Sequence, residues 1–247
     1  MANQTRFVIV ADSHGDNIDE VAKNAVLDFI KDYRPTIRLH LGDAFDFRNL
    51  RKGASDDEKA ETLEDDWQMG EEFLRQFYQG GKRNVFLNGN HDDRIYQLAG
   101  SSVGVMRDYA NAGVKRLNGI FKKCDAKTLP YDSRTGVYRL GRLNCVHGYY
   151  TGKTSAIKHG AAYGNVAYGH THTIETAPVE TAGGYQEARG IGCLATTDMG
   201  YNARSPSKLR HNNGWAYGVL NDDKSYHIFQ TTRVGDDFLC ATGFKRY

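Results

Sequence analysis

The 247-residue chain contains only four prolines and four cysteines, and it has no long apolar run. So few prolines, with 25% charged and 40% hydrophobic residues, argue against a disordered or linker-rich chain. The cysteines show no C-x-x-C spacing, which argues against a structural zinc knuckle. No apolar run approaches the length that a membrane-spanning helix needs. A net charge of +2 gives no overall electrostatic case for binding nucleic acid.

The size of the chain and its first residues set further expectations. A strand pattern begins within six residues of Met1, which leaves no room for a signal peptide. We therefore expect reduced thiols in a cytoplasm and no membrane partner, and the oligomeric state stays open. No shift in composition marks a domain boundary, so we expect a single domain over residues 1–247.

Apolar spacing predicts alternating strands and helices in the first half of the chain. Helical spacing recurs over 18–30 and 63–77, each time after an apolar strand run. A short helix is expected within 100–119, and irregular loops at 47–58 and 197–214. Strand patterns dominate from residue 136 onward, at 137–140, 143–146, 166–168, 186–191, 215–220 and 226–230. This order predicts an α/β fold: a two-sheet β-sandwich flanked by helices.

Five apolar runs lead directly into short polar clusters. These clusters are 12–14 (Asp-Ser-His), 42–46 (Gly-Asp-Ala-Phe-Asp), 89–92 (Gly-Asn-His-Asp), 147–148 (His-Gly) and 169–172 (Gly-His-Thr-His). The carboxyl ends of buried strands converge on one edge, where open α/β sheets build their sites. Asp, His and Asn are ligands for hard or borderline divalent cations. The clusters therefore predict a two-metal phosphoesterase site.

Spacing within the clusters suggests how their side chains share one site. Asp12 and His14 are two residues apart, as are His170 and His172, and such side chains point the same way on extended backbone. The glycine that opens three of the clusters lets the backbone turn sharply and pass close to the site. Five of the nine histidines fall inside the clusters. The others are His40, His159, His211 and His227.

Three features near the clusters stay open between a structural and a functional role. Cys145, two residues before His147, fits a buried strand cysteine better than a site residue. Tyr149 and Tyr150 are either ordinary loop aromatics or flank a substrate base. The stretch from Lys115 to Lys127 carries five Lys or Arg against one Asp, and is either a solvated face or steers substrate.

The order of the five motifs resembles that of the calcineurin-like metallophosphoesterase superfamily, and particularly its small bacterial and phage members. The motifs span residues 12–172, and the β-rich tail fits the second sheet of that family's four-layer fold. The resemblance implies two divalent ions, manganese first, with iron, zinc or nickel as alternatives. One ion would be held by Asp12, His14, Asp43 and His172, and the second by Asp43 as a bridge with Asn90, His147 and His170. The resemblance also makes His91 the catalytic histidine and Asp46 and Asp92 carboxylates behind the ligands.

Charge and position agree with that assignment. Two divalent ions bring four positive charges, and two aspartates with a bridging hydroxide leave an excess of about one, which suits a phosphate oxygen anion. Ions about 3.5–4 Å apart clamp the phosphate and acidify the water between them. Asn90 adds an oxygen ligand without adding charge. His91 follows Asn90 directly, so on extended backbone it faces away from the ligands and can protonate a leaving alkoxide.

The motifs specify the chemistry better than the substrate. Phosphoprotein phosphatases of this superfamily usually carry Arg directly after the second Asp of Gly-Asp-x-x-Asp, and Glu at the end of the third motif. Here Phe47 follows Asp46, Arg48 is displaced by one position, and the third motif ends in Asp92. We therefore expect a phosphodiesterase that acts on a nucleotide or other small diester through a metal-bridging hydroxide, with His91 as acid.

Three alternatives to the small-diester phosphodiesterase stay open. The first is a monoesterase acting on phosphoproteins or small molecules. The second is a DNA or RNA nuclease, which the basic stretch from Lys115 to Lys127 keeps possible. The third is a non-catalytic scaffold on the same fold, and the presence of all seven expected ligands together with His91 argues against it.

Overall fold

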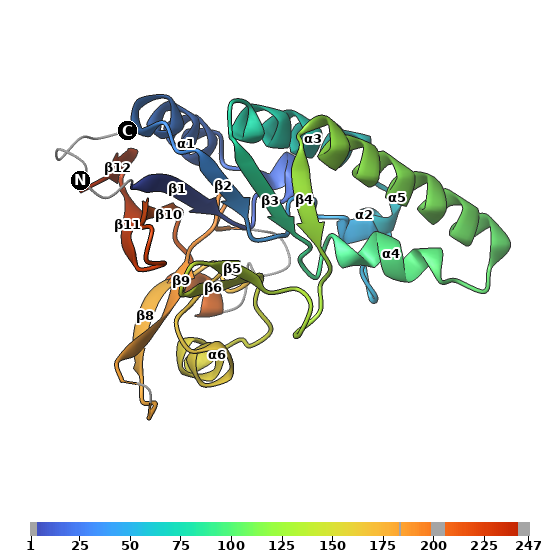
Figure 1. The fold of residues 1–247 in the computed structure, drawn as a ribbon. Helices are drawn as coiled ribbons and strands as arrows, with labels where there is room; N and C mark the ends of the chain where they lie inside the picture. Colours follow the sequence, from blue (N-terminus) through green and yellow to red (C-terminus); the bar gives the residue numbers. More distant parts are fainter. Residues whose placement is uncertain (1–3, 183, 199–205, 242–247) are drawn as a thin grey trace.

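The computed structural model describes residues 4–182, 184–198 and 206–241, which form two mixed β-sheets (Figure 1). The strands of the larger sheet are, in spatial order, β12 (Asp237–Leu239), β11 (Tyr226–Val234), β10 (Gly214–Leu220), β1 (Thr5–Val10), β2 (Ile37–His40), β3 (Arg83–Leu87) and β4 (Ala126–Leu129). Those of the smaller sheet are β5 (Tyr138–Leu140), β6 (Leu143–Val146), β7 (Val166–Tyr168), β9 (Gln186–Ile191) and β8 (Ile174–Val179). Neighbours from β1 to β4 run parallel, as do β6, β7 and β9.

Helices cover the outer faces of both sheets, so the fold has four layers. The larger sheet carries α1 (Glu20–Tyr33), α3 (Glu64–Tyr78) and α5 (Gly104–Lys123), and the smaller sheet carries α6 (Ser155–Tyr163). Side chains alternate along β1, so Val8 and Val10 pack against the helices while Phe7 and Ile9 face the smaller sheet. The predicted two-sheet α/β sandwich flanked by helices is confirmed.

Apolar side chains from both sheets form one core between them. Leu39 and Leu87 of the larger sheet belong to the same cluster as Leu143, Cys145 and Ala167 of the smaller one. Cys145 is fully buried, and burial raises the pKa of its thiol, in agreement with its interpretation as a strand cysteine. All four cysteines are free thiols. The single domain and the cytoplasmic location stay predictions.

Each strand predicted before a polar cluster forms, and so do the first two predicted helices. Helix α1 begins after Asp19, whose side chain accepts a hydrogen bond from the backbone N–H of Ala22 at 2.9 Å. It ends at Tyr33, and the next residue, Arg34, has left-handed backbone just before Pro35. Local sequence signals therefore place α1 correctly between the first two strands.

The expected loop at 47–58 and the expected short helix within 100–119 were wrong in detail. The loop contains a 3-10 helix at Arg48–Leu50 and the start of α2 (Asp56–Ala60), whose capping box of Ser55 and Glu58 is visible in the sequence. The short helix is the 20-residue α5. Val105, Met106 and Tyr109 of this helix are exposed, and such apolar residues on the outward face obscure the helical period.

Several short elements had no signal strong enough to predict them. They are β4, β8, β12, α4 (Asp93–Ala99) and α6. Strand β8 contains Pro178 and lies at a sheet edge, where proline is tolerated. The expected loop at 197–214 contains a 3-10 helix at Pro206–Arg210, and its residues 199–205 lie outside the described residues. No described helix has both the length and the apolar character needed to cross a membrane.

Candidate metal centre

The five polar clusters meet at the carboxyl ends of β1, β2 and β3 in one sheet and β6 and β7 in the other. Backbone hydrogen bonds hold their loops together: the Asp12 N–H donates to the Gly42 carbonyl, and the His14 N–H to the Asp43 carbonyl, each at 2.9 Å. The Gly169 N–H donates to the His147 carbonyl at 2.8 Å. The predicted convergence of the strand ends on one site is therefore present.

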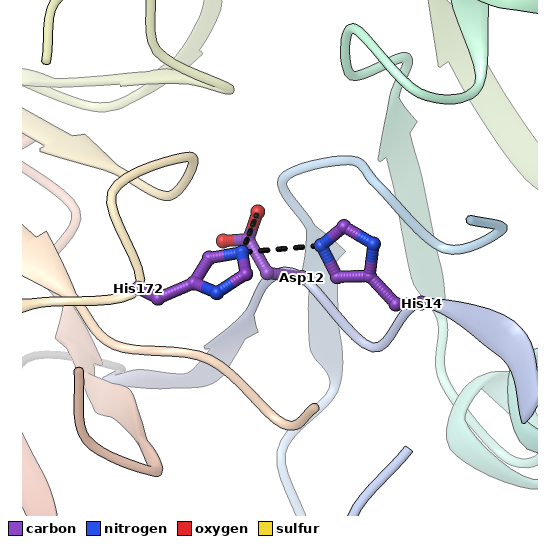
Figure 2. A group of neighbouring side chains, drawn as sticks. All are labelled: Asp12, His14 and His172. Atoms are coloured by element: carbon purple, nitrogen blue, oxygen red, sulfur yellow. Dashed lines mark hydrogen bonds and ion pairs between the residues drawn. The ribbon is translucent and has the colours of Figure 1, made fainter. Parts of the chain in front are cut away.

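Asp12, His14 and His172 form a first group of potential ligands (Figure 2). Nε2 of His172 lies 3.1 Å from Nε2 of His14 and 3.6 Å from Oδ1 of Asp12. All three side chains are buried. Burial opposes ionisation of Asp12, but its hydrogen bond and charge interaction with His172, together with the charge of His147, outweigh burial and lower the pKa of the carboxyl. The group combines one carboxylate with two imidazoles at the end of β1.

Asp43, His147 and His170 form a second group, and Asn90 joins it. Nε2 of His147 lies 3.3 Å from Oδ2 of Asp43 and 3.0 Å from Oδ1 of Asn90. Oδ1 of Asn90 also lies 2.8 Å from Nδ1 of His170. Burial lowers the pKa of His170 to about 4, so its imidazole is neutral near pH 7, as a ligand must be.

Asp43 contacts histidines of both groups. Its Oδ2 is 3.3 Å from Nε2 of His147 and 3.9 Å from Nε2 of His14. Burial opposes ionisation, but the imidazoles of His147, His91 and His14 hold the pKa of Asp43 well below its usual range. This carboxylate is the member that faces both sets of histidines.

The hydrogen-bond pattern tests whether these residues fit a cation. Nδ1 of His147 lies 2.9 Å from the Leu41 carbonyl, which only accepts, so Nδ1 carries the proton and Nε2 presents a lone pair. That lone pair faces oxygens of Asn90 and Asp43, which also accept. Burial alone would lower the pKa of His147. The carboxylate of Asp43 outweighs burial and raises this pKa to about 9, because a proton on Nε2 can be donated to these facing oxygens. A divalent cation would satisfy the same atoms, so the residues fit a metal.

The backbone at these clusters differs from the expected extended conformation. Five of the seven predicted ligands have left-handed backbone, with φ between 51° and 67°: Asp12, His14, Asp43, His170 and His172. Such conformations are uncommon outside glycine and concentrate at functional sites. Each pair of residues two apart does reach one site, but through left-handed turns rather than strand alternation. Ser13, between Asp12 and His14, points away from the site, with its Oγ 3.1 Å from Nε2 of His40.

Glycine at three strand ends lets the loops approach one another, as predicted. A Cβ at Gly42 would lie 2.5 Å from the Gly89 nitrogen, and one at Gly169 would lie 2.6 Å from Oδ2 of Asp12. Gly42 also has a φ of 109°, which other residues rarely adopt. The most crowded of the three is Gly89, where a Cβ would lie 2.0 Å from Oδ1 of Asp43.

We expect Gly89→Ala to weaken metal binding, because the new methyl group must displace the Asp43 carboxylate or its loop. Such overpacking costs about 1–3 kcal/mol of stability. Gly119→Ala in α5 is the control, since nothing lies within 4 Å of that Cβ, and it should stabilise the helix by about 1 kcal/mol. Calorimetric titration with Mn²⁺ and urea unfolding measure both effects. Wild-type manganese affinity in Gly89→Ala would contradict this geometry.

His91 lies at the edge of the ligand set. The prediction that it faces away from the ligands was wrong. The reason is that residues 90–92 form a turn and not an extended segment. Nδ1 of His91 lies 2.7 Å from Oδ1 of Asp46 and 2.9 Å from the Asp46 carbonyl, so this nitrogen is the donor. Nε2 lies 3.9 Å from Oδ2 of Asp43. The His91 side chain is 13% exposed, so a substrate can reach it.

Asp92 and Asp46, the two carboxylates expected behind the ligands, contact the loops and side chains of the predicted ligands. Asp92 accepts hydrogen bonds from four backbone N–H groups and thereby holds two loops together. The donors are Asp43 (2.7 Å), Gly89 (2.9 Å), Ala44 (3.1 Å) and Phe45 (3.1 Å). Asp46 lies 3.3 Å from Nδ1 of His14 and 2.7 Å from Nδ1 of His91, and these contacts outweigh burial and lower its pKa. One carboxylate orients the backbone and the other orients two imidazoles.

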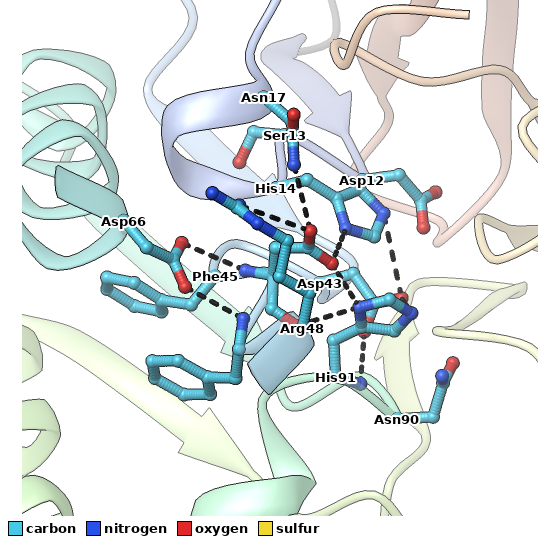
Figure 3. A network of polar contacts seen from close by, with 12 residues as sticks. Asp12, Ser13, His14, Asn17, Asp43, Phe45, Arg48, Asp66, Asn90 and His91 are labelled. Atoms are coloured by element: carbon cyan, nitrogen blue, oxygen red, sulfur yellow. Dashed lines mark hydrogen bonds and ion pairs between the residues drawn. The ribbon is translucent and has the colours of Figure 1, made fainter. Parts of the chain in front are cut away.

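Sequence patterns missed several residues that support the site. Asp66 accepts hydrogen bonds from the N–H groups of Asp46 at 3.0 Å and Phe47 at 2.7 Å (Figure 3). Arg48 donates to both carboxylate oxygens of Asp16, at 2.7 and 2.6 Å. Other missed neighbours are Asn17, which donates to Asp46, and His211, whose ring lies 5.1 Å from that of His172. No motif marks Asp66, Asn17 or His211, and Arg48 lies one position after the place of the arginine in the phosphatase motif.

Asp66 also predicts a pH dependence of stability. Burial raises its pKa to about 6, from an ordinary value of 3.8, so the folded protein holds this proton more tightly than the unfolded chain. The associated stability is present below pH 4 and is lost as pH rises through about 6. The free energy of unfolding of Asp66→Asn, minus that of wild type, should therefore rise by about 2–3 kcal/mol from pH 4 to pH 7. Urea unfolding at both values measures this, with exposed Asp65→Asn as control. A pH-independent difference would contradict the assignment.

Tyr149 and Tyr150 now have defined surroundings. Tyr149 stacks on Tyr131 with ring centroids 5.0 Å apart, and Tyr131 meets the His147 ring edge-on at 5.6 Å. Tyr150 packs edge-on against His159 at 5.0 Å. The first tyrosine therefore belongs to the rim of the site, whereas the second covers α6.

No family model and no curated protein sequence matches the chain. Among solved structures, it resembles a single-substitution variant of Vps29 from Entamoeba histolytica, with a TM-score of 0.51 and 15% identity over 98% of each chain. It also resembles a metallophosphoesterase from Sphaerobacter thermophilus, with a TM-score of 0.50 and 15% identity over 94% of this chain and 89% of that one. The chain therefore has the fold of the calcineurin-like metallophosphoesterases, which confirms, at the level of the fold, the resemblance read from its five motifs.

Proposed function

We propose that this protein is a phosphodiesterase that depends on two divalent metal ions, with manganese as the first candidate. Asp12, His14, Asp43 and His172 would hold one ion. Asp43, Asn90, His147 and His170 would hold the other. The observation that carries this proposal is the position of Asp43, whose Oδ2 faces imidazoles of both ligand groups at 3.3 and 3.9 Å.

The bound ions would polarise the phosphoester and supply an acidified water. The residues of the chain supply the rest of the chemistry. Asp46 fixes Nδ1 of His91 at 2.7 Å, which leaves Nε2 beside Asp43, where an imidazolium would give its proton to the departing oxygen. Asp92 holds the loops of Asp43 and Gly89 at one spacing through backbone hydrogen bonds. The ligands are therefore positioned before substrate binds.

The charges around the site favour a substrate with one ionised phosphate oxygen. Two aspartates among the ligands leave a small positive excess on two divalent ions. Arg48, the nearest counterpart of the phosphatase arginine, already donates to Asp16 and Glu61. It is therefore neutralised and does not offer its charge to a second phosphate oxygen, as a monoester dianion would need.

We expect diesters to be hydrolysed faster than monoesters at neutral pH. Enzyme stripped with a chelator and reloaded with Mn²⁺ should turn over bis(4-nitrophenyl) phosphate with a higher kcat/KM than 4-nitrophenyl phosphate. A monoester value more than about tenfold higher, or roughly 1.4 kcal/mol in barrier, would reverse this ranking. No turnover of either ester by metal-loaded enzyme would contradict the proposed function itself.

A further inference from the structure

Strands β4 and β5 lie at the ends of their strand orders, at the open edge of the two sheets (Figure 1). A basic groove runs along this edge. It consists of two hollows of about 530 and 710 Å³ that share Lys127 and Tyr138 as lining residues. The cations that line this edge groove are Lys82, Arg83, Lys122, Lys127, Arg134 and Arg139. Asp125 is the one acidic residue among the lining residues of the two hollows.

The positive charges of the edge groove are not neutralised within the described chain. None of its six cations lies in an ion pair with a described carboxylate, although ion pairs hold arginines elsewhere, such as Arg51 with Glu58. All six are exposed. The net charge of the whole chain is only +2, so the net charge does not reveal the positive charge concentrated at this edge. Such a surface attracts a polyanion.

A row of aromatic rings connects the edge groove to the metal centre. Tyr163 lines the groove, and its ring centroid lies 6.4 Å from that of Tyr149. Tyr149 stacks on Tyr131 at 5.0 Å, and Tyr131 meets the His147 ring at 5.6 Å. Strand β4 is parallel to β3, so its carboxyl end points to the same edge as the metal ligands. The groove therefore leads toward the site.

We propose that the edge groove binds single-stranded nucleic acid and delivers its phosphodiesters to the metal centre. This rests on the proposed function and names its substrate class. A row of cations that tracks a backbone, with aromatic rings alongside on which bases stack, is how proteins bind single strands. An acidic peptide would match the charge but would bring neither bases nor a phosphodiester. Hydrolysis would join the water oxygen to phosphorus, break the bond to one sugar oxygen, and place on that oxygen a proton from His91, which regains one from the attacking water.

The test reverses two charges of the edge groove, in the variant Lys127→Glu/Arg139→Glu. Binding of labelled twelve-nucleotide dT and U strands is followed by fluorescence anisotropy with a chelator present, over a series of salt concentrations. We expect affinity to fall at least about tenfold and the salt dependence to weaken by roughly 1.4 units of slope, at about 0.7 per phosphate contact. The strand bound more tightly by wild type identifies DNA or RNA as the natural class.

The control has the same net charge but alters lysines outside the edge groove: Lys31→Glu/Lys59→Glu, at side chains 75% and 57% exposed. It should lose less than about threefold in affinity. Both double variants should hydrolyse bis(4-nitrophenyl) phosphate within about twofold of wild type. If the groove variant does not fold, Lys127→Gln/Arg139→Gln replaces it, with an expected loss of about threefold or more.

If the groove variant binds the strand as tightly as wild type and still hydrolyses the small diester, the edge groove does not bind nucleic acid. The proposed function would not be affected. Displacement of the strand by polyglutamate of equal charge, as efficiently as by unlabelled strand, would overturn the nucleic-acid assignment. Groove-dependent strand binding without turnover of any diester would support the groove and contradict the proposed function. The two failures are therefore distinguishable.

Discussion

Asp43→Asn is expected to lose diesterase activity and metal together. Asp43 is the carboxylate that faces both ligand groups, so an amide there removes one negative charge from both sites at once. We expect kcat/KM to fall by at least about 10³-fold, or roughly 4 kcal/mol in barrier, with less than one ion left per chain. Elemental analysis and turnover of bis(4-nitrophenyl) phosphate measure both quantities.

The control for this variant is Asp65→Asn, which removes the same charge from the exposed face of α3 and should change neither quantity. Far-ultraviolet circular dichroism separates metal loss from unfolding. Two tightly bound metals in an active Asp43→Asn variant would rule out the bridging role of this carboxylate.

His91→Ala is expected to lower kcat by about 10²–10⁴-fold while both metals stay bound. Nδ1 of His91 is held by Asp46, and Nε2 lies 3.9 Å from Oδ2 of Asp43, where an acid can reach a departing oxygen. The loss should be smaller for nitrophenolate, which needs little protonation, and larger for a sugar alkoxide. Metal content and kcat on one activated and one unactivated diester check this.

Two further variants serve as comparisons for His91→Ala. His170→Ala should lose metal and slow every substrate alike, because His170 belongs to the second ligand group. His227→Ala, at an exposed position on β11, should behave as wild type. Equal slowing of both diesters in His91→Ala would leave electrostatic positioning in place of acid catalysis. Loss of a metal would make His91 a ligand, a role that its closeness to His14 and Asp43 allows.

The sequence was sufficient for the two-sheet fold and for the convergence of the predicted ligands, because both depend on local patterns. Buried strands such as β1 and β7 contain short apolar runs, and each is followed directly by the residues it delivers. The sequence could not reveal how those residues turn inward. Asp12 and His14 use left-handed backbone, which close contacts between loops impose and no local pattern encodes.

The supporting residues were invisible for a different reason. Asp66 follows Asp65 in an acidic helix, and only the tertiary structure buries one while exposing the other. His40 carried a weak signal, as a histidine inside an apolar run. It is fully buried, accepts a hydrogen bond from the Gly42 N–H at 3.1 Å, and burial lowers its pKa to about 3. The edge groove joins residues from 82 to 163, which no single stretch of sequence brings together.

The measurement that tests the account most directly is a manganese titration of chelator-stripped protein, with bound metal and diester hydrolysis followed on the same samples. The account predicts two ions per chain and activity that rises with their binding. It also predicts that Asp43→Asn loses both responses. Full diester hydrolysis by protein without bound metal, or saturation with manganese that brings no hydrolysis, would contradict it.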